Sequence, residues 1–395
     1  MQTDVLIVGA GPAGLMLAVE LRRRGVECVV IDRQLSRLAR IGGLALNPRS
    51  LELLELVGVL EPCLEQSIKV KGTRLFAGPG RSRYVPFTSS DQDLSLTHSG
   101  IRILTQQVLE SQLRQRAEEL GCSVSYGVSF AGLELDSEAE RAMVTLFTSQ
   151  GQEVRVECRF VAGCDGPYSS VRQAAGIDFP GRTLDWIYSI GEFAINWDLP
   201  ANEMFEFLGS EHLLVALPLP ESGRYRLTTW EAAPPSPNPD RVEHGPLVSP
   251  PTLLDFQDVV NEVVPFPTGI TEPDNLHCFR VGRRIAEKFH QGQVCLAGDA
   301  AHAFPPATAL GMNLGLEDAY VLASKIADGG TQELLESYHK ERHEASLRAL
   351  HQTEEAMIDL STLVLQDERD DRDAQNVLME RWSPHERFIF ESTRA

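Results

Sequence analysis

The segment at residues 4–33 is the feature that most constrains the fold. It reads DVLIVGAGPAGLMLAVELRRRGVECVVIDR, so an apolar strand, a glycine-rich turn, a helix and a second strand follow one another. Gly9 permits a tight turn, Gly11 lets the backbone approach a pyrophosphate, and Gly14 lets the helix lie close to the sheet. The phosphates would meet the unpaired N–H groups and the positive dipole end of the helix. The pattern predicts a dinucleotide-binding unit.

Asp32 ends the second strand of this unit, 21 residues after Gly11. A carboxylate at this place accepts hydrogen bonds from a ribose hydroxyl. The unit by itself fits NAD and FAD equally well. The choice between them depends on the rest of the chain.

Length and charge limit the class of protein. A chain of 395 residues can bury a large core and is expected to contain two or three structural units. The 56 acidic residues against 36 basic ones give a formal charge of -20, which opposes binding to nucleic acid and to anionic membrane surfaces. No apolar run reaches membrane-spanning length. We expect a globular protein with neither a nucleic-acid partner nor a membrane span.

The cysteines and the N-terminus bear on the compartment. The seven cysteines lack C-x-x-C spacing, and most of them lie in apolar runs such as CVVID and VCLAG, as reduced core thiols do. The N-terminal apolar stretch has no basic segment before it and contains Asp4, which disfavours a signal peptide. We therefore expect a cytoplasmic protein.

Two later segments repeat the pattern of an apolar strand followed by a polar loop. CDGPYSSVR places Asp165 after one strand and before a helix start, and VCLAGDAAHAFPP delivers Asp299 after another. Ligands of open α/β sheets collect at such strand ends. Pro305 and the proline after it stiffen the second loop by fixing their φ angles.

Taken together and in this order, the three segments resemble the class A flavoprotein monooxygenases, the family of p-hydroxybenzoate hydroxylase and the polyketide aromatic hydroxylases. The resemblance covers most of residues 2–350. It implies an α/β fold in which a doubly wound, Rossmann-like FAD-binding domain holds an inserted β-rich substrate domain and is followed by C-terminal helices. The implied divisions are an FAD-binding domain at 1–72, 101–178 and 280–350, a substrate domain at 73–100 and 179–279, and a C-terminal helical segment at 351–395.

The resemblance also implies how residues hold the cofactor. Asp299 would contact the ribityl chain, Asp165 would lie near the pyrophosphate region shared by FAD and NAD(P)H, and Arg33 would support the adenosine half. Gln106 would approach the ribityl chain or the isoalloxazine ring. The backbone near Phe130 would approach the adenine.

Further implied contacts surround the flavin ring. Pro305 would lie in the loop beneath it, and Gly311 would open a helix whose first N–H groups, around Met312 and Asn313, face the pyrimidine edge. Reduced flavin carries negative charge there, which a helix N-terminus stabilises by roughly 1 to 2 kcal/mol at most. Arg40, in a loop after the second strand, is the candidate contact for NAD(P)H or for a moving ring. No dedicated catalytic acid or base is evident.

The implied activity is that of an FAD-dependent monooxygenase of secondary metabolism. It would consume NAD(P)H and O2 and insert one oxygen atom, through a C4a-hydroperoxyflavin, into an aromatic, phenolic or polycyclic polyketide-like molecule. Two alternatives stay open: a flavin oxidoreductase without oxygen insertion, and a flavoprotein that binds ligand without turnover. The second is suggested by Thr308-Ala309-Leu310, where the family commonly has Gly-Gly-Gln. A halogenase is disfavoured because W-x-W-x-I-P is missing.

Histidines offer no metal site in this interpretation. His339 and His343 stand four apart in HKERH, but charged neighbours on both sides favour a solvated helix face over zinc binding. His302 is expected to bond backbone in its turn, a structural role. We expect no bound metal, and also no thioredoxin-like domain such as many polyketide hydroxylases carry.

The middle of the chain is predicted to supply the substrate-covering sheet. Residues 182–230 contain strand-like runs, with a hairpin turning at 221–223, and residues 234–251 form a proline-rich irregular loop. Aromatic side chains in these runs would line a pocket or pack in a core: Trp186, Tyr188, Phe193, Trp197, Phe205 and Phe207.

Overall fold

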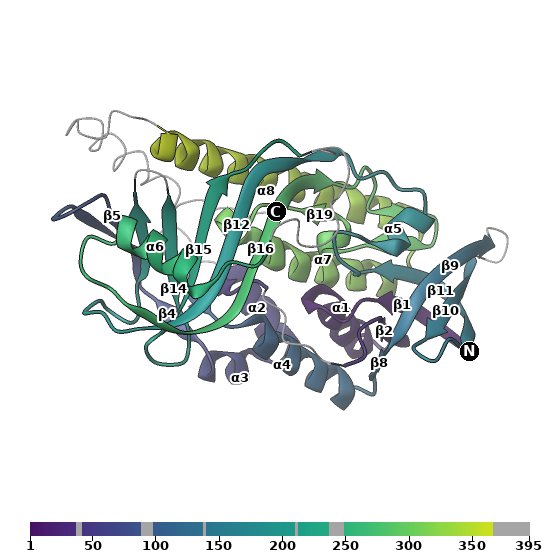
Figure 1. Ribbon diagram of the computed structural model, residues 1–395. Coiled ribbons are helices and arrows are strands. Elements are labelled where there is room, and N and C mark those ends of the chain that lie inside the picture. The colour runs from purple at the N-terminus through teal and green to yellow at the C-terminus, as the bar shows by residue number, and fades with distance from the viewer. Residues whose placement is uncertain (37–41, 88–97, 137–139, 210–211, 237–248, 366–395) are drawn as a thin grey trace.

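The computed structural model describes residues 1–36, 42–87, 98–136, 140–209, 212–236 and 249–365 (Figure 1). Arg40 lies outside these residues, as do most of the proline-rich segment and residues 366–395 of the expected C-terminal segment. The described residues form two layers, each built on an eight-stranded sheet.

The first layer is a doubly wound parallel sheet. Its neighbouring strands, in order across the sheet, are β17 (His290–Gln291), β18 (Val294–Leu296), β11 (Glu153–Gly163), β1 (Gln2–Val8), β2 (Cys28–Asp32) and β8 (Val124–Tyr126). The strands from β18 to β8 are mutually parallel, and β1, where the chain begins, lies at their centre. Two antiparallel strands, β9 (Val128–Asp136) and β10 (Arg141–Thr148), extend β11 outward. This order confirms the Rossmann-like fold class.

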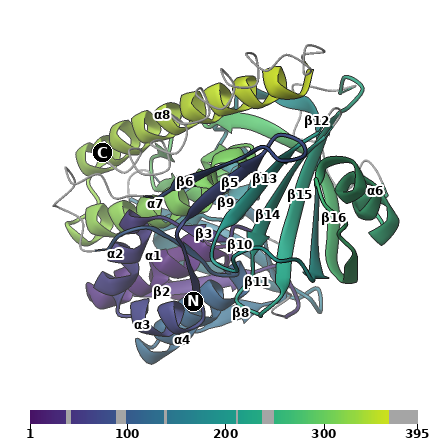
Figure 2. The ribbon, with the colours of Figure 1, turned by 90° about the vertical axis from the view of Figure 1, so that its left-hand side faces the viewer.

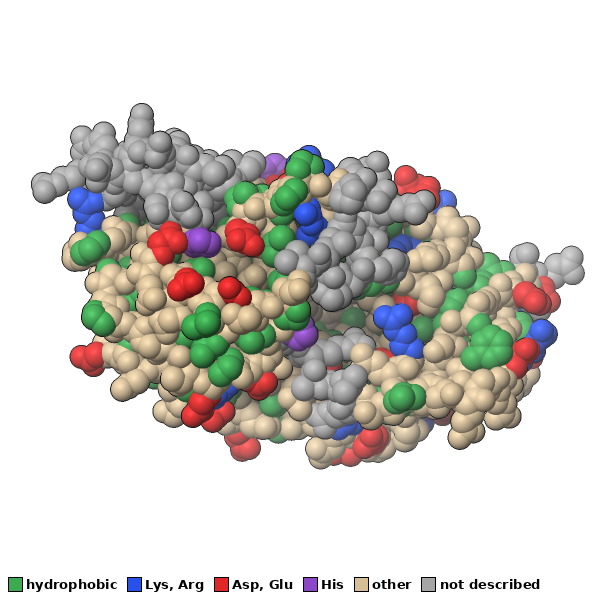
Figure 3. Space-filling view, in the orientation of Figure 1, with side chains coloured by type: hydrophobic (Ala, Val, Ile, Leu, Met, Phe, Trp, Pro, Cys, Tyr) green, Lys and Arg blue, Asp and Glu red, His purple; other side chains and the backbone are tan. Residues whose placement is uncertain are grey.

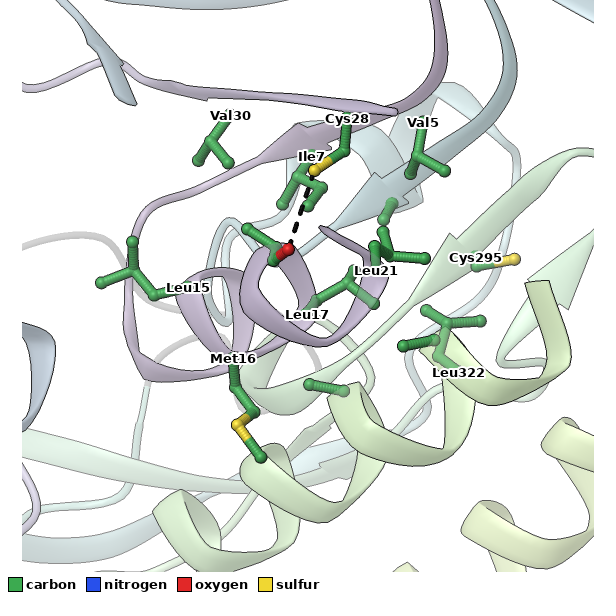
Figure 4. Packing of buried hydrophobic residues seen from close by; sticks show 14 of the residues in the cluster. Val5, Ile7, Leu15, Met16, Leu17, Leu21, Cys28, Val30, Cys295 and Leu322 are labelled. Atoms are coloured by element: carbon green, nitrogen blue, oxygen red, sulfur yellow. Dashed lines mark hydrogen bonds between the residues drawn. The ribbon is translucent and has the colours of Figure 1, made fainter. Parts of the chain in front are cut away.

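Helices bury the faces of this sheet. They are α1 (Pro12–Arg23), α4 (Gln106–Glu119), α5 (Ser170–Ala174) and α7 (Leu310–Ala327). Helix α1 is almost entirely buried, since it packs against the sheet, α4 and α7. Figure 4 shows α1 beneath the strand residues Val5, Ile7 and Cys28, with Met16 directed at α7. The Sγ of Cys28 donates to the Ala18 carbonyl at 3.9 Å, which ties β2 to this helix.

The second layer is a mainly antiparallel sheet. Its strands, in order, are β19 (His302–Ala303), β16 (Ile270–Ile285), β12 (Gly181–Ile195), β15 (Arg224–Ala232), β14 (Leu213–Pro218), β13 (Met204–Leu208), β5 (Gly72–Phe76) and β6 (Ser82–Pro86). β14 and β15 form the predicted hairpin, and the Arg224 N–H closes its turn on the Glu221 carbonyl at 3.2 Å.

The aromatic side chains of this sheet divide between its two faces. One core contains Phe193, Phe205 and Phe207 together with helix α6 (Leu253–Val263). Trp197 packs against this core. Tyr188 stacks on Trp230 at 5.4 Å in a separate cluster, with Trp186 beside them. Side chains alternate along a strand, so residues 188 and 193 of β12 point to opposite faces. Of the two fates left open by the sequence, a pocket or a core, the structure shows core packing, in two clusters on opposite faces of the sheet.

The two layers are joined by helices and a small sheet. These elements are α2 (Pro48–Val57), α3 (Leu60–Glu65), the strands β3 (Ala45–Leu46), β4 (Ile68–Val70) and β7 (Ile101–Ile103), the short 3-10 turns η1 (Gly298–Ala300) and η2 (Pro306–Thr308), and α8 (Gln332–Leu365). Helix α8 packs on α7 and on β16, and thus spans both layers (Figure 2). It continues without a break through residue 350, where the sequence suggested a boundary.

The cysteines and the helices bear on two expectations drawn from composition. All seven cysteines are free thiols and only Cys164 is less than fully buried, as predicted for reduced core cysteines. Within the described ranges, no helix combines the length and the apolar character needed to span a bilayer.

Candidate active site

Three loops that are far apart in the sequence leave the parallel sheet at the same level. Val8 at the end of β1 is in register with Gly163 at the end of β11, and Gly163 is in register with Leu296 at the end of β18. The residues that follow are the glycine turn, the CDGP segment and the GDAAH segment. The carboxyl ends of these strands therefore bring all three predicted motifs to one edge of the sheet, where such folds bind ligands.

The glycines of the first turn serve different purposes. Gly9 has φ 108°, and a Cβ there would collide with the Cys164 carbonyl. A Cβ on Gly14 would collide with the Gly9 carbonyl. Gly11, the N-cap of α1, has φ -76°, and a Cβ there would meet nothing within 4 Å. Packing of the protein itself thus requires Gly9 and Gly14, whereas the space at Gly11 is open.

Asp32 fixes this turn to the end of β2. Its side chain is 9% exposed, and its two oxygens accept from the N–H groups of Ala10 and Gln34, each at 2.9 Å. A carboxylate oxygen can accept more than one hydrogen bond, so acceptor capacity is left for a ligand.

The predicted adenosine contacts lie directly after β2 and on β9. Arg33 follows Asp32 and is exposed, and Phe130 of β9 is half-buried. The Gly127 N–H donates to the Gln34 carbonyl at 2.6 Å, which brings the turn between β8 and β9 next to the end of β2.

Asp165 is placed by the helix that follows it. One oxygen accepts from the Ser170 N–H at 2.7 Å and the Ser170 hydroxyl at 2.9 Å, which caps the start of α5. The other oxygen, Oδ1, is buried without a hydrogen-bond partner. A buried carboxylate oxygen left in this way is costly unless a ligand donates to it.

Arg172 connects two of the motifs and was not singled out from the sequence. Its side chain is 3% exposed and donates to the carbonyls of Pro167 and Ala300, both at 2.8 Å. Burial lowers the pKa of its guanidinium to about 10. Arg172 therefore holds the CDGP segment against the GDAAH segment.

Asp299 and Asp318 form a contrasting pair of carboxylates. The Asp299 side chain is exposed, yet it sits amid dense protein, and this desolvation raises its pKa; Asp318 adds to the effect and His302 opposes it. Asp318 is fully buried, which by itself would raise its pKa, but His302 and Arg342 outweigh burial and lower it. Asp318 thus has hydrogen-bond partners within the protein, whereas no described residue hydrogen-bonds to the Asp299 side chain.

The contacts of Asp318 support the GDAAH loop from below. Oδ2 accepts from the Gly298 N–H at 3.1 Å and pairs with His302 Nε2 at 2.6 Å, while Oδ1 accepts from Arg342 Nε at 2.8 Å. His302 is fully buried. It bonds this carboxylate side chain, and not backbone as the sequence suggested.

Gln106 and Met312 flank a pair of glycines. Gln106 Oε1 accepts from the Gly43 N–H at 3.0 Å, and a Cβ on Gly43 would lie 2.9 Å from the Met312 Sδ. The first turns of α4 and α7 therefore lie on either side of the glycine pair. Arg226 of the second sheet donates to the Gly42 carbonyl at 2.6 Å.

The side chain of Asn313 is fully occupied by the protein. It accepts from the Asn47 N–H at 3.1 Å and the Ser50 hydroxyl at 2.6 Å, and donates to the carbonyls of Ala45 at 3.0 Å and Ala309 at 2.8 Å. Only backbone groups at this helix start are left for a ligand. Gly311 faces open space, since a Cβ there would meet nothing within 4 Å.

Pro305 lies in the loop that precedes α7. It is buried, with φ -57°, and η2 follows it directly. The fixed φ of proline favours this extended residue before a tight turn.

A buried ion pair joins the second sheet to the same glycines, and the sequence did not reveal it. Arg226 and Glu192 are 5% and 7% exposed and pair at 2.6 Å. Glu192 also borders a cavity of about 690 Å³ that reaches Thr105 next to α4. Figure 3 shows the surface hollowed where the two layers meet.

The two histidines of HKERH are packed, contrary to the expected solvated face. Both are half-buried against Phe289, with ring centroids 6.0 Å away for His339 and 5.6 Å for His343. Burial lowers the pKa of both imidazoles. The described part of the chain contains no cluster of side chains able to hold a metal ion.

The fold and the site define the class of nucleotide-binding α/β flavoproteins. The chain matches the protein family described as "FAD binding domain" over residues 2–353, and it belongs to that family. It is 32% identical to a rifampicin monooxygenase of Streptomyces venezuelae over 356 residues, covering 89% of this chain and 70% of the relative. It is 34% identical to a 12-dehydrotetracycline 5-monooxygenase/anhydrotetracycline 6-monooxygenase of Streptomyces rimosus over 367 residues, covering 89% and 69%.

Solved structures agree with these relatives. The anhydrotetracycline hydroxylase OxyS from Streptomyces rimosus aligns with a TM-score of 0.76 and 29% identity, over 98% of this chain and 75% of that one. The predicted resemblance and the FAD cofactor are thereby confirmed. The protein is an FAD-dependent monooxygenase.

Two alanine substitutions separate protein packing from ligand contact in the glycine turn. Gly14→Ala overpacks the junction of α1 and the turn, so we expect the apoprotein to lose about 1 to 3 kcal/mol of unfolding free energy. Gly11→Ala meets open space and allowed backbone angles, so apoprotein stability should stay unchanged. Its added methyl should instead weaken FAD binding at least about tenfold, or 1.4 kcal/mol. Urea unfolding of both apoproteins and FAD titration measure these effects; unaltered FAD affinity of Gly11→Ala would contradict the pyrophosphate contact.

Asp299→Asn tests the open carboxylate with nearly constant shape. The pKa of Asp299 is raised above the ordinary 3.8, so charging this group opposes folding at neutral pH and ceases to do so as pH falls below 3.8. We expect the Asn apoprotein to melt at higher temperature than wild type at neutral pH, with the difference vanishing in acid. FAD affinity should nevertheless fall, because charged acceptors contribute about 1.5 to 3 kcal/mol. Melting curves across pH and FAD titration are the measurements, and equal FAD affinity would argue against the ribityl contact.

Proposed function

We propose that this monooxygenase hydroxylates a phenolic or polycyclic polyketide-like molecule in the cytoplasm, with NAD(P)H and O2 as cosubstrates. Two relatives named for rifampicin and for 12-dehydrotetracycline and anhydrotetracycline support this substrate class. Its seven free thiols favour a reducing compartment.

One observation carries the proposal: Arg226 reaches the Gly42 carbonyl, next to the loop that Gln106 and Met312 flank. The face of the second sheet that bears Arg226 is therefore directed at the proposed flavin ring. Along that face, the pair Glu192 and Arg226 is followed by Ile190 with Thr228, and then by Tyr188 with Trp230.

Each pair lies about 7 Å beyond the one before it, as two residues of a strand span that length. The face thus carries a mostly apolar strip that begins near the proposed ring and ends in aromatic side chains, with Tyr188 1% and Trp230 6% exposed. Flat, multi-ring substrates suit such a surface, because stacked and apolar contacts hold them while few polar groups fix their orientation.

One part of the proposed cofactor site would hold the adenosine and pyrophosphate groups of FAD. Asp32 would accept from the ribose hydroxyls, Arg33 and the backbone near Phe130 would hold the adenosine half, and the N–H groups after Gly11 would bind the pyrophosphate. The unpartnered oxygen of Asp165 supports a donor group at this place, such as a ribose or ribityl hydroxyl near the phosphates.

The second half of the site surrounds the flavin. Asp299 and Gln106 would bind the ribityl hydroxyls, and Pro305 would bound the ring from below. The free N–H groups of Gly311 and Met312 would face the pyrimidine edge. The bound flavin supplies the redox and oxygen chemistry, while these residues orient it, exclude water and stabilise its negative charge.

The decisive experiment is a screen of phenolic and polycyclic compounds with purified holoenzyme, NAD(P)H and isotopically labelled O2. A substrate should stimulate NAD(P)H oxidation and yield a product that carries one labelled oxygen atom. Oxidised product without label would instead identify a flavin oxidoreductase. Bound compounds that never stimulate NAD(P)H oxidation would identify a binding protein.

Arg40 is proposed as the contact for NAD(P)H or the moving ring, because a guanidinium is permanently charged and grips phosphate in a bidentate way. Arg40→Ala should fold and keep FAD, while reduction of the substrate-bound flavin slows at least about tenfold, or 1.4 kcal/mol. Anaerobic stopped-flow absorbance isolates that step. Arg155→Ala removes an exposed arginine paired with Glu153 on β11 and is the matched control. A wild-type rate in Arg40→Ala would return Arg40 to an ordinary surface role.

A further inference from the structure

The loop before α7 contains a strained residue that glycine would relieve. Ala309 has φ 54°, in the left-handed region, and it is the N-cap of α7. A residue with a Cβ costs about 1 to 3 kcal/mol there and persists only when its surroundings hold it. The residues on either side of it are Thr308 and Leu310.

A hydroxyl pair holds the loop from one side. Thr308 is 7% exposed and Thr353 of α8 is fully buried, and their Oγ1 atoms lie 2.8 Å apart. Thr353 also donates to the Ala349 carbonyl at 2.8 Å. A hydroxyl has one proton, so the proton of Thr353 is committed to Ala349 and Thr308 must donate to Thr353. The direction of the hydrogen bond is thereby fixed.

Apolar contacts hold the loop from the other side. Leu310 and Leu314 of α7 form a small buried cluster with Ala345 and Ala349 of α8, and Phe304 packs on it. The small alanines let the two helices approach closely. Helix α8 therefore contacts the residues on both sides of Ala309.

We propose that Thr353 is a positioning residue for the flavin edge, acting through Thr308. It keeps Ala309 left-handed and so aims the first N–H groups of α7, at Gly311 and Met312, toward the pyrimidine edge of the ring. The inference rests on the proposed cofactor site. It assigns to α8, by a contact 45 residues along the chain, the task of holding the start of α7 in place.

Three variants test the proposal. Thr353→Val keeps the shape but removes the acceptor, Thr353→Ser keeps the acceptor, and Ser346→Ala removes another fully buried hydroxyl of α8, which bonds the Arg342 carbonyl at 2.8 Å. Hydrogen exchange in the apoprotein reports the loop without FAD. We expect the Ala309 amide, which donates to the Pro306 carbonyl at 3.2 Å, to exchange at least about tenfold faster, or 1.4 kcal/mol, in Thr353→Val, and at wild-type rates in the other two.

The holoenzymes then report the flavin. Thr353→Val should shift the visible flavin spectrum and lower the midpoint potential, because the N–H groups that stabilise the reduced ring are less well aimed; Thr353→Ser should restore both. Unchanged loop exchange in Thr353→Val, or the same changes in Ser346→Ala, would overturn the proposal and leave the proposed function intact. Faster loop exchange with an unaltered spectrum and potential would overturn it too, and would also contradict the location assigned to the flavin edge.

Discussion

The buried carboxylate of Asp318 is the interaction on which the site depends. It receives the Gly298 N–H, His302 and Arg342, and so joins the GDAAH loop, α7 and α8 at one point without solvent. Desolvating an ion costs several kcal/mol, which only such charged and hydrogen-bonded partners offset. Losing one partner of a buried pair typically costs about 3 to 5 kcal/mol, because the remaining charge stays buried. Asp318 therefore holds the GDAAH loop in place at two points, the Gly298 N–H and the His302 side chain.

This support explains why Asp299 is left unsatisfied nearby. Asp318 has the hydrogen-bonded partners His302 and Arg342, which lower its pKa, whereas no described side chain hydrogen-bonds to Asp299, whose pKa is raised by desolvation. A carboxylate held open at the end of β18, on a loop fixed by Asp318 and Arg172, is an acceptor prepared for ligand hydroxyls. The stability lost by leaving Asp299 unpaired is recovered when a ligand that supplies those hydroxyls binds.

The sequence predicted the parts of the site that are built from local patterns. The roles of Gly9 and Gly14, and the three strand ends carrying Gly9, Asp165 and Asp299, follow from residue types next to apolar runs. Arg172 and Arg226 escaped notice because their partners lie 128 and 184 residues away, and only packing brings them together. Composition left a pocket and a core open for the aromatic side chains of the second sheet, because only the alternation along β12 and the packing partners decide which face each one joins.

Thr308-Ala309-Leu310 shows how far local sequence can mislead. Read alone, three residues with side chains at this place suggest a stiffened loop. The compensation lies outside the segment, in the hydroxyl of Thr353 and in the alanines of α8 that accommodate Leu310. A strained left-handed residue costs about as much as one good buried hydrogen bond and a few apolar contacts return. A departure from a family pattern at a binding loop is therefore evidence about function only once the residues packed against that loop have been taken into account.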